Sequence, residues 1–264
     1  HSISFQPWGS FLIAGPLGCG KTTFAESLSA FFQGHEGTIL RFDMTEYSTL
    51  GSINNLIGSP QGYWGYQNGG LLTTVARQYP NSVLLFEQID KAHSHVWQLL
   101  RQILETGFLR DHQGHLVSFK HHIILMTCHL PPASFISKDK ICSYLECTFP
   151  SQFLAQLTVL PFTPLLDEHI QQIVLHKLLK IKDELATKGK QFEFDPAIPH
   201  RLTKEVATKG LAHLDTILAN HILKPLYGDY WYSTEWSRIE GFQCQIDEKE
   251  SIKLEGKLYE RCLV

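Results

Sequence analysis

The chain has 264 residues, of which 43% are hydrophobic and 19% charged, enough for one large domain or for a large and a small one. Its 23 lysines and arginines against 26 aspartates and glutamates leave a net charge of −3, which argues against a nucleic-acid-binding protein. No apolar run approaches the roughly 20 residues of a membrane-spanning helix, and no signal peptide is recognisable.

The elements expected from residue 9 to about residue 130 alternate between short apolar strands and helices. This alternation predicts an α/β fold with a parallel sheet sandwiched by helices, and ligands at the carboxyl ends of the strands. The expected strands are Ser10–Ala14, Thr38–Asp43, Ser82–Phe86 and His122–Thr127, and the expected helices are Thr22–Phe32, Gly69–Tyr79 and His95–Glu105.

The pattern changes from Pro164 onward, where Asp167–Lys188 has the periodicity of a long amphipathic helix. We therefore predict two domains, a large P-loop α/β domain over residues 1–162 and a small α-rich lid over residues 163–264. The lid's further expected elements are a strand at Gln191–Phe194, helices at Pro196–Ala207 and Leu211–Leu223, and one or two strands within Phe242–Leu263.

A phosphate-binding loop lies between the first expected strand and the first expected helix. The sequence from Gly15 to Thr22 fits G-x-x-x-x-G-K-[ST], whose glycines let backbone N–H groups point at phosphate oxygens. In such a loop Lys21 reaches the β- and γ-phosphates and the Thr22 hydroxyl ligates Mg²⁺. We therefore predict ATP and Mg²⁺ as cofactors, bound by Gly15, Pro16, Gly18, Cys19, Gly20, Lys21, Thr22 and Thr23.

Six scattered cysteines form no C-x-x-C pair, and Cys19 lies inside the phosphate loop, where a disulfide would be awkward. We expect an intracellular, reducing compartment, cytoplasm or organelle lumen. Because the chain starts at His1, almost directly on a core strand, we also expect it to be a fragment of a longer protein.

The segments resemble, in order and spacing, the second nucleotide-binding module of Clp-type AAA+ ATPases of the ClpB kind. The resemblance runs to about Leu226 and implies an AAA+ fold, with a ring, often of six, made of this chain or of related AAA+ subunits. The matching segments besides the phosphate loop are Arg41–Tyr47, Leu56–Tyr66, Asp90–His93 and Ile124–Thr127, with weaker lid matches at Gly210–Leu214 and Lys224–Leu226.

The resemblance also implies a substrate contact at Gly62–Gly65, which matches the family's pore loop. There Tyr63, followed by Trp64, would grip an unfolded polypeptide in the channel of the ring, since a flat aromatic side chain offers sequence-tolerant apolar contact. The alternative is a surface turn without a substrate. The family's peptidase-docking loop is not recognisable in Leu130–Phe149, so we expect no peptidase partner.

The candidate catalytic positions depart from the family pattern. Glu87 stands at the metal-side carboxylate, one methylene longer than the family's aspartate, and is expected to help hold Mg²⁺ with Thr22. Gln88 stands at the catalytic glutamate and His129 at the polar sensor. Loss of a general base typically costs about 10²–10⁴-fold in rate.

Both expected arginines are missing as well. Gln156 stands at the position of the arginine finger and Ala212 at that of the lid's sensor arginine. A misalignment is the alternative, in which a displaced arginine such as Arg201 or Arg110 would serve.

We therefore predict an ATP-binding module with weak or absent hydrolysis and a structural or regulatory role in a ring that handles protein substrates. The alternative is an active ATP-dependent unfoldase or disaggregase chaperone in which Gln88 is engineered. A third possibility is an interaction scaffold that binds no nucleotide.

Overall fold

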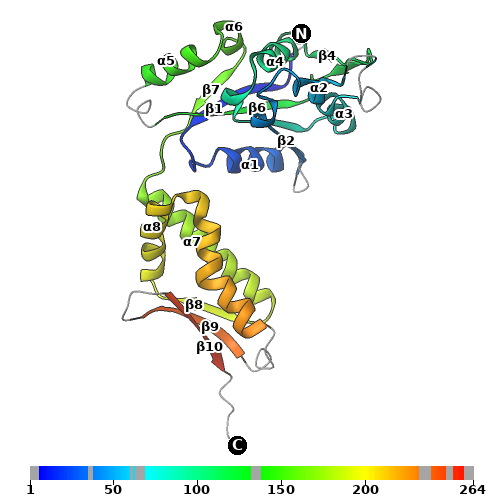
Figure 1. Ribbon diagram of the computed structural model, residues 1–264. Coiled ribbons are helices and arrows are strands. Elements are labelled where there is room, and N and C mark those ends of the chain that lie inside the picture. Colours follow the sequence, from blue (N-terminus) through cyan, green and yellow to red (C-terminus); the bar gives the residue numbers. More distant parts are fainter. Residues whose placement is uncertain are drawn as a thin grey trace, which may run out of the picture. The chain divides into compact units, whose positions relative to one another are not determined.

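The computed structural model describes residues 6–34, 38–59, 62, 69–131, 138–231, 239–247 and 252–258. The chain divides into two compact units, His1–Pro164 and Leu165–Val264 (Figure 1). Within the described residues, no helix is both long enough and apolar enough to cross a bilayer.

The first unit is built on a five-stranded parallel sheet with the strand order β2-β3-β6-β1-β7. The sequence predicted four of these strands but not β7, which is short, lies at an edge of the sheet and ends at Pro161. The strands are β1 (Gly9–Gly15), β2 (Ile39–Asp43), β3 (Val83–Glu87), β6 (Ile123–His129) and β7 (Thr158–Pro161).

Helices cover both faces of this sheet (Figure 1), because the strands are apolar on both sides. Alternate residues of β3 point to opposite faces: Leu84 and Phe86 join one core, and Val83 and Leu85 join the other. The face of Val83 packs against α1 (Lys21–Gln33). The face of Phe86 is covered by α2 (Ile53–Ile57), α3 (Leu71–Gln78), α4 (Ser94–Thr106), α5 (Lys138–Thr148) and α6 (Ser151–Leu154).

Short elements complete the first unit. A 3₁₀ turn, η1 (Met44–Tyr47), follows β2, and a second one, η3 (Ile89–Lys91), follows β3. The antiparallel hairpin of β4 (Phe108–Arg110) and β5 (Leu116–Ser118) leads into β6.

The second unit packs helices on a three-stranded sheet with the order β10-β9-β8, in which β9 is antiparallel to β10 and parallel to β8. Strands were expected here at Gln191–Phe194 and within Phe242–Leu263, and the structure joins three strands into one sheet. Its strands are β8 (Gln191–Phe194), β9 (Ile239–Ile246) and β10 (Ile252–Leu258), and its longer helices are α7 (Asp167–Thr187) and α8 (Ala197–Lys209).

The helix expected over Leu211–Leu223 is divided in the structure. It comprises a 3₁₀ turn, η5 (Leu211–His213), a short α-helix, α9 (Leu214–Leu218), and a π-helical turn, η6 (Ala219–Leu223). A second π-helical segment, η7 (Leu226–Trp231), follows.

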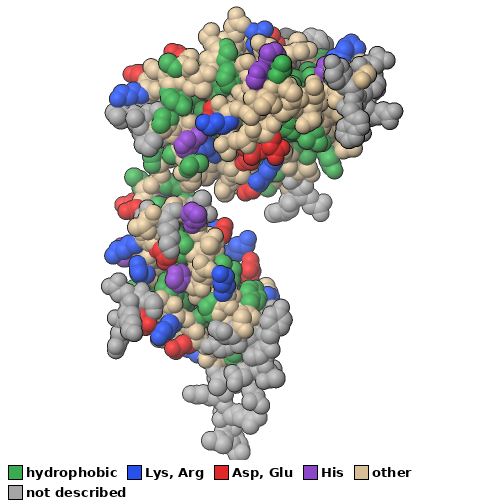
Figure 2. All heavy atoms as spheres, viewed as in Figure 1, with side chains coloured by type: hydrophobic (Ala, Val, Ile, Leu, Met, Phe, Trp, Pro, Cys, Tyr) green, Lys and Arg blue, Asp and Glu red, His purple; other side chains and the backbone are tan. Residues whose placement is uncertain are grey.

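Charged side chains of both signs are interspersed on the face of each unit seen in Figure 2. That distribution agrees with the small net charge of −3.

Candidate functional site

The phosphate loop connects the carboxyl end of β1 to the start of α1. Gly18 and Gly20 have φ angles of 73° and 88°, in the left-handed region that favours glycine. A Cβ built on Gly20 would meet no atom within 4 Å, so the loop has open space at that point. The backbone thus turns as a phosphate-binding loop requires, with the amino end of α1 behind it.

The base of the loop is packed tightly against the segment that follows β7. The amide of Phe162 donates to the carbonyl of Ala14 at 2.8 Å. A Cβ on Gly15 would lie 2.8 Å from the Phe162 carbonyl oxygen and 2.9 Å from the Cys19 sulfur. Only glycine therefore fits at position 15.

The ammonium group of Lys21 lies over the loop itself, because its Nζ donates to the carbonyls of Gly15 at 2.9 Å and Pro16 at 2.6 Å. The buried Cys19 thiol also donates to Pro16, at 3.1 Å. Burial raises the pKa of Cys19 although the nearby Lys21 charge opposes the shift. Cys19 is therefore a neutral packing group, and Lys21 is the cation of the loop.

A hydrogen bond joins the first turn of α1 to the end of β3, since Thr22 Oγ1 donates to Glu87 Oε1 at 2.9 Å. Both residues are partly buried, and Thr23 beside them is exposed. A hydroxyl next to a carboxylate at a phosphate loop is a donor set that suits Mg²⁺, which binds through one or two carboxylates together with substrate phosphates.

Gln88 follows β3 in a left-handed backbone conformation, with φ 55° and ψ 51°. Its backbone N–H donates to the buried Thr127 Oγ1 at 3.1 Å, which holds this turn against β6. Such a conformation is costly for a residue with a Cβ, and residues held in it cluster at active sites and ligand-binding segments. The side chain of Gln88 is exposed, and its amide cannot accept a proton as a carboxylate would.

His129 ends β6 directly beside the phosphate loop, because it pairs in register with Gly15 of β1. Its backbone N–H donates to Asp90 Oδ1 at 3.3 Å. The Asp90 side chain is only 6% exposed, and its Oδ2 lies 3.5 Å from Lys91 Nζ. Burial, with the Asp90 carboxylate as the next cause, raises the pKa of Cys128.

Asp90 is a further residue of this site, which the sequence indicates only as part of the matching segment Asp90–His93. Its position in that segment, three residues after Glu87, was the available signal.

The AAA domain model of the Cdc48 subfamily matches residues 6–202. The chain belongs to the AAA family. The AAA+ fold class is confirmed, and so is the resemblance to a ClpB-like AAA+ module.

Among the similar relatives of this AAA module are proteins named chaperone protein ClpB. The one from Mycoplasma pneumoniae is 38% identical over 197 residues, covering 73% of this chain and 27% of the relative. Those from Rickettsia bellii and Vibrio cholerae are 36% and 34% identical over 211 and 201 residues, covering 75% and 72% of this chain and 25% and 24% of the relatives. The chain thus spans about a quarter of the length of these curated relatives.

The structure of the AAA module brings together most of the predicted site residues of the first unit, namely the phosphate loop with Thr22, Glu87, Gln88 and His129. Gln156 follows α6 and is half-buried, with its N–H donating to the carbonyl of Phe153 at 3.2 Å. Tyr63 and Trp64, the residues expected to form a pore loop, lie outside the described residues.

Of the two arginines considered as replacements, one belongs to each unit. Arg110 lies on β4, and its guanidinium donates to the carbonyl of Gly114 within the same hairpin at 2.8 Å. Arg201 lies on α8 and Ala212 in η5, both in the second unit.

In the part of the AAA module that the structure describes, no group of three or more histidine, cysteine, aspartate or glutamate side chains could hold a metal ion. At the phosphate loop, Thr22 and Glu87 could hold Mg²⁺ together with the phosphate oxygens of a nucleotide.

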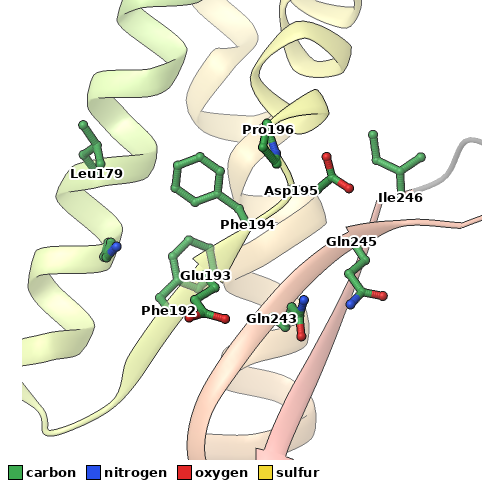
Figure 3. Close-up of a pocket in the computed structure, with 10 residues that line it drawn as sticks. Leu179, Phe192, Glu193, Phe194, Asp195, Pro196, Gln243, Gln245 and Ile246 are labelled. Atoms are coloured by element: carbon green, nitrogen blue, oxygen red, sulfur yellow. The ribbon is translucent and has the colours of Figure 1, made fainter.

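The second unit contains a separate cavity of about 500 Å³ between α7 and the strands β8 and β9 (Figure 3). Its lining mixes apolar side chains such as Leu179 and Phe194 with charged ones such as Glu193 and Asp195. The phosphate loop contributes nothing to this lining, so the cavity is distinct from the nucleotide site.

Proposed function

We propose that this chain is an ATP-binding AAA+ module of the ClpB-like type that hydrolyses ATP weakly or not at all. The observation that carries the proposal is the hydrogen bond between Thr22 and Glu87 beside Lys21, in a site where the next residue is the neutral Gln88. The site retains the groups that bind phosphate and Mg²⁺ and lacks the carboxylate that takes a proton from water.

Each retained residue has a defined role in holding the nucleotide. The backbone N–H groups of Gly18, Gly20 and Lys21 would cradle the phosphates, and the Lys21 ammonium would exchange its carbonyl partners for phosphate oxygens. Thr22 and Glu87 would hold Mg²⁺, which supplies charge neutralisation at the phosphates.

Hydrolysis is impaired at two positions of the first unit. Gln88 can hydrogen-bond a water molecule but cannot accept its proton, which alone costs about 10²–10⁴-fold. Gln156 stands in place of the arginine finger. The guanidinium of such an arginine raises the rate by about 10³–10⁵-fold in related phosphoryl-transfer enzymes. Such losses are not additive, but either one makes turnover slow.

The role of the module would be structural or regulatory, within a ring of this chain or of related AAA+ subunits. The relatives' name, chaperone protein ClpB, supports a protein substrate, which Tyr63 and Trp64 would contact. We place the protein in an intracellular, reducing compartment.

Equilibrium binding of Mg-ATP, with phosphate release followed in the same samples, tests the proposal. We expect binding that is lost in Lys21→Ala, with little or no phosphate release. Binding that persists in Lys21→Ala would mean that the phosphate loop is not the site, and the scaffold hypothesis would then take precedence.

The variant Gln88→Glu tests whether the missing base is the sole defect. We expect only a small rise in turnover, because Gln156 is unchanged. Vigorous hydrolysis by this single variant would contradict the proposal and favour the active unfoldase.

A further inference from the structure

The strand β8 lies at an edge of the sheet in the second unit, because β9 is its one neighbour among the described strands. Just after β8, the N–H of Asp195 donates to the carbonyl of Cys244 in β9 at 3.1 Å. Backbone groups alternate in direction along a strand, so the N–H and C=O groups of Phe192 and Phe194 point away from β9. The edge therefore offers two N–H and two C=O groups for pairing with another strand.

A hollow runs along this edge. The cavity of about 500 Å³ between α7 and β8 adjoins a second one of about 330 Å³, and both are lined by Lys182, Phe192 and Glu193. Phe192 belongs to the core of the unit, and Glu193 is exposed on the opposite face of the sheet. Because residues on both faces of β8 line both cavities, the hollow passes the edge of the strand.

The wall opposite β8 is α7, which lines the two cavities with Leu179, Lys182 and Ala186. Leu179 is 43% exposed although its side chain is apolar. In Figure 3 the ring of Phe194 lies between β8 and α7. An open strand edge beside an apolar helix wall fits an extended peptide, which pairs its main chain with the strand and packs alternate side chains against the helix.

The charged groups that line the cavities differ in how far they are engaged. Lys190 donates to a backbone carbonyl of β9, and Asp195 Oδ1 accepts the N–H two residues further on at 2.8 Å. Glu193 Oε2 accepts from Lys257 Nζ at 2.8 Å, and this hydrogen bond, with a smaller effect of the Lys182 charge, lowers the pKa of Glu193. Lys182 itself has no hydrogen bond or ion pair with another described residue. The unengaged charge of the hollow is thus a cation, which is complementary to a carboxylate.

We infer that the edge of β8 binds an extended segment of a partner protein as an added strand, with an apolar side chain against Leu179 and an acidic side chain opposite Lys182. Leu179 and Lys182 are three residues apart, about 4.5 Å along the helix. Side chains two residues apart on a strand share a face at about 6.6 Å, a difference that the flexible lysine can span. The segment therefore carries an apolar and an acidic residue two positions apart.

The probe is a display library of random nine-residue peptides, screened against the full chain, with the selected peptides then measured at concentrations up to about 1 mM. We expect selected peptides to contain the apolar and acidic pair at this spacing. Residue-resolved hydrogen exchange should show the amides of Phe192 and Phe194 slowed at least about tenfold by a selected peptide. The amide of Glu193, which faces β9, should change less.

N-methylation of the selected peptide tests strand pairing without altering the protein. Methyl groups on the alternate amides that face β8 remove the donors and should weaken binding more than about tenfold. The same number of methyl groups on the other alternate amides should leave the affinity largely unchanged. Equal losses for the two sets would overturn the assigned pairing.

Two pairs of variants test the wall formed by α7. Lys182→Glu should weaken an acidic peptide about two- to tenfold and favour the same peptide with lysine in place of its acidic residue. Lys180→Glu, at an exposed position that lines neither cavity, makes the same change in net charge and should not reverse this preference. Leu179→Ser should weaken binding about fivefold, whereas Leu175→Ser, also exposed and outside both linings, should not.

Absence of any binding peptide, or binding that leaves the amides of Phe192 and Phe194 unprotected, would overturn the inference. Protection of these amides that rises with protein concentration, without a peptide, would also overturn it, because a second copy of the chain would then cover the edge. A preference of the unmodified chain for basic peptides would overturn the assigned chemistry of the partner. None of these outcomes bears on Lys21-dependent nucleotide binding, so the proposed function is tested separately.

Discussion

At the scale of single residues, the hydroxyl of Thr22 links the phosphate loop to the carboxylate at the end of β3, through its hydrogen bond to Glu87 at 2.9 Å. Thr22→Val keeps the shape of the side chain and removes the hydroxyl. We expect affinity for nucleotide in Mg²⁺ to fall about tenfold or more, since hydrogen bonds to charged groups contribute about 1.5–3 kcal/mol. Titration with Mg²⁺ and with a chelator measures this, and Thr22→Ser should retain the Mg²⁺ dependence. Full Mg²⁺ dependence in Thr22→Val would rule out the assigned metal role.

A second residue-scale prediction concerns the buried His122, which is 1% exposed and packs against the ring of Phe119 at 5.5 Å. Burial lowers the pKa of His122 from its ordinary value of 6.5. As the pH falls below about 6.5, the unfolded chain therefore takes up the proton first, and the free energy of unfolding decreases until the folded pKa is reached. Above that window His122 is neutral in both states and adds no pH dependence.

Urea unfolding at pH 7.5 and pH 5.5 checks this sign. We expect His122→Phe to lose less stability between these two pH values than the unmodified chain loses, whatever its stability at pH 7.5. The exposed neighbour His121, replaced by Gln, should lose as much as the unmodified chain. If His122→Phe loses as much free energy of unfolding between these pH values as the unmodified chain, groups other than His122 cause the acid sensitivity.

At the scale of elements, Gly70 allows α3 to begin against the backbone of α2. A Cβ at Gly70 would lie 2.4 Å from both the carbonyl carbon of Ile57 and the carbonyl oxygen of Leu56, which are backbone atoms that cannot rotate away. We expect Gly70→Ala to destabilise the chain by about 1–3 kcal/mol through this overlap. Urea unfolding of the variant and of the unmodified chain measures this difference in free energy of unfolding.

Gly51 supplies the matched control for that change. It lies just before α2, and a Cβ there would meet no atom within 4 Å. Gly51→Ala should therefore change stability by less than about 0.5 kcal/mol, as surface substitutions usually do. If the two variants lose equal stability, the overlap between a Cβ at Gly70 and the backbone of α2 is not the cause of the destabilisation.

At the scale of the whole molecule, the sequence alone was sufficient to predict the elements whose structure depends on residues close to one another in the chain. The apolar run Val83–Phe86 followed by Glu87 predicted both a buried strand and a polar residue at its carboxyl end. Since the carboxyl ends of parallel strands meet at one edge, the proximity of Glu87 to the phosphate loop could be expected.

The parts that escaped prediction depend on contacts between distant segments. The strand β7 carries no strong signal of its own and exists because Thr158–Pro161 pairs with β1. The hydrogen bond from the His129 backbone N–H to Asp90 requires the left-handed turn at Gln88. Thr127, on another strand, holds that turn in place by accepting the Gln88 N–H. No local pattern encodes such a contact.

The two units have separate hydrophobic cores, and this separation predicts where a core mutation is felt. Phe86 is fully buried in the first unit and stacks on Phe42 with ring centroids 5.2 Å apart, whereas Phe192 is buried in the second. Replacing either ring with alanine should cost about 3–5 kcal/mol in its own unit. Hydrogen exchange measured by mass spectrometry should show lost protection within residues 6–164 for Phe86→Ala and within residues 165–258 for Phe192→Ala. Loss of protection in β1 and β6 caused by Phe192→Ala would mean that the two cores unfold as one cooperative unit, contrary to their separate packing.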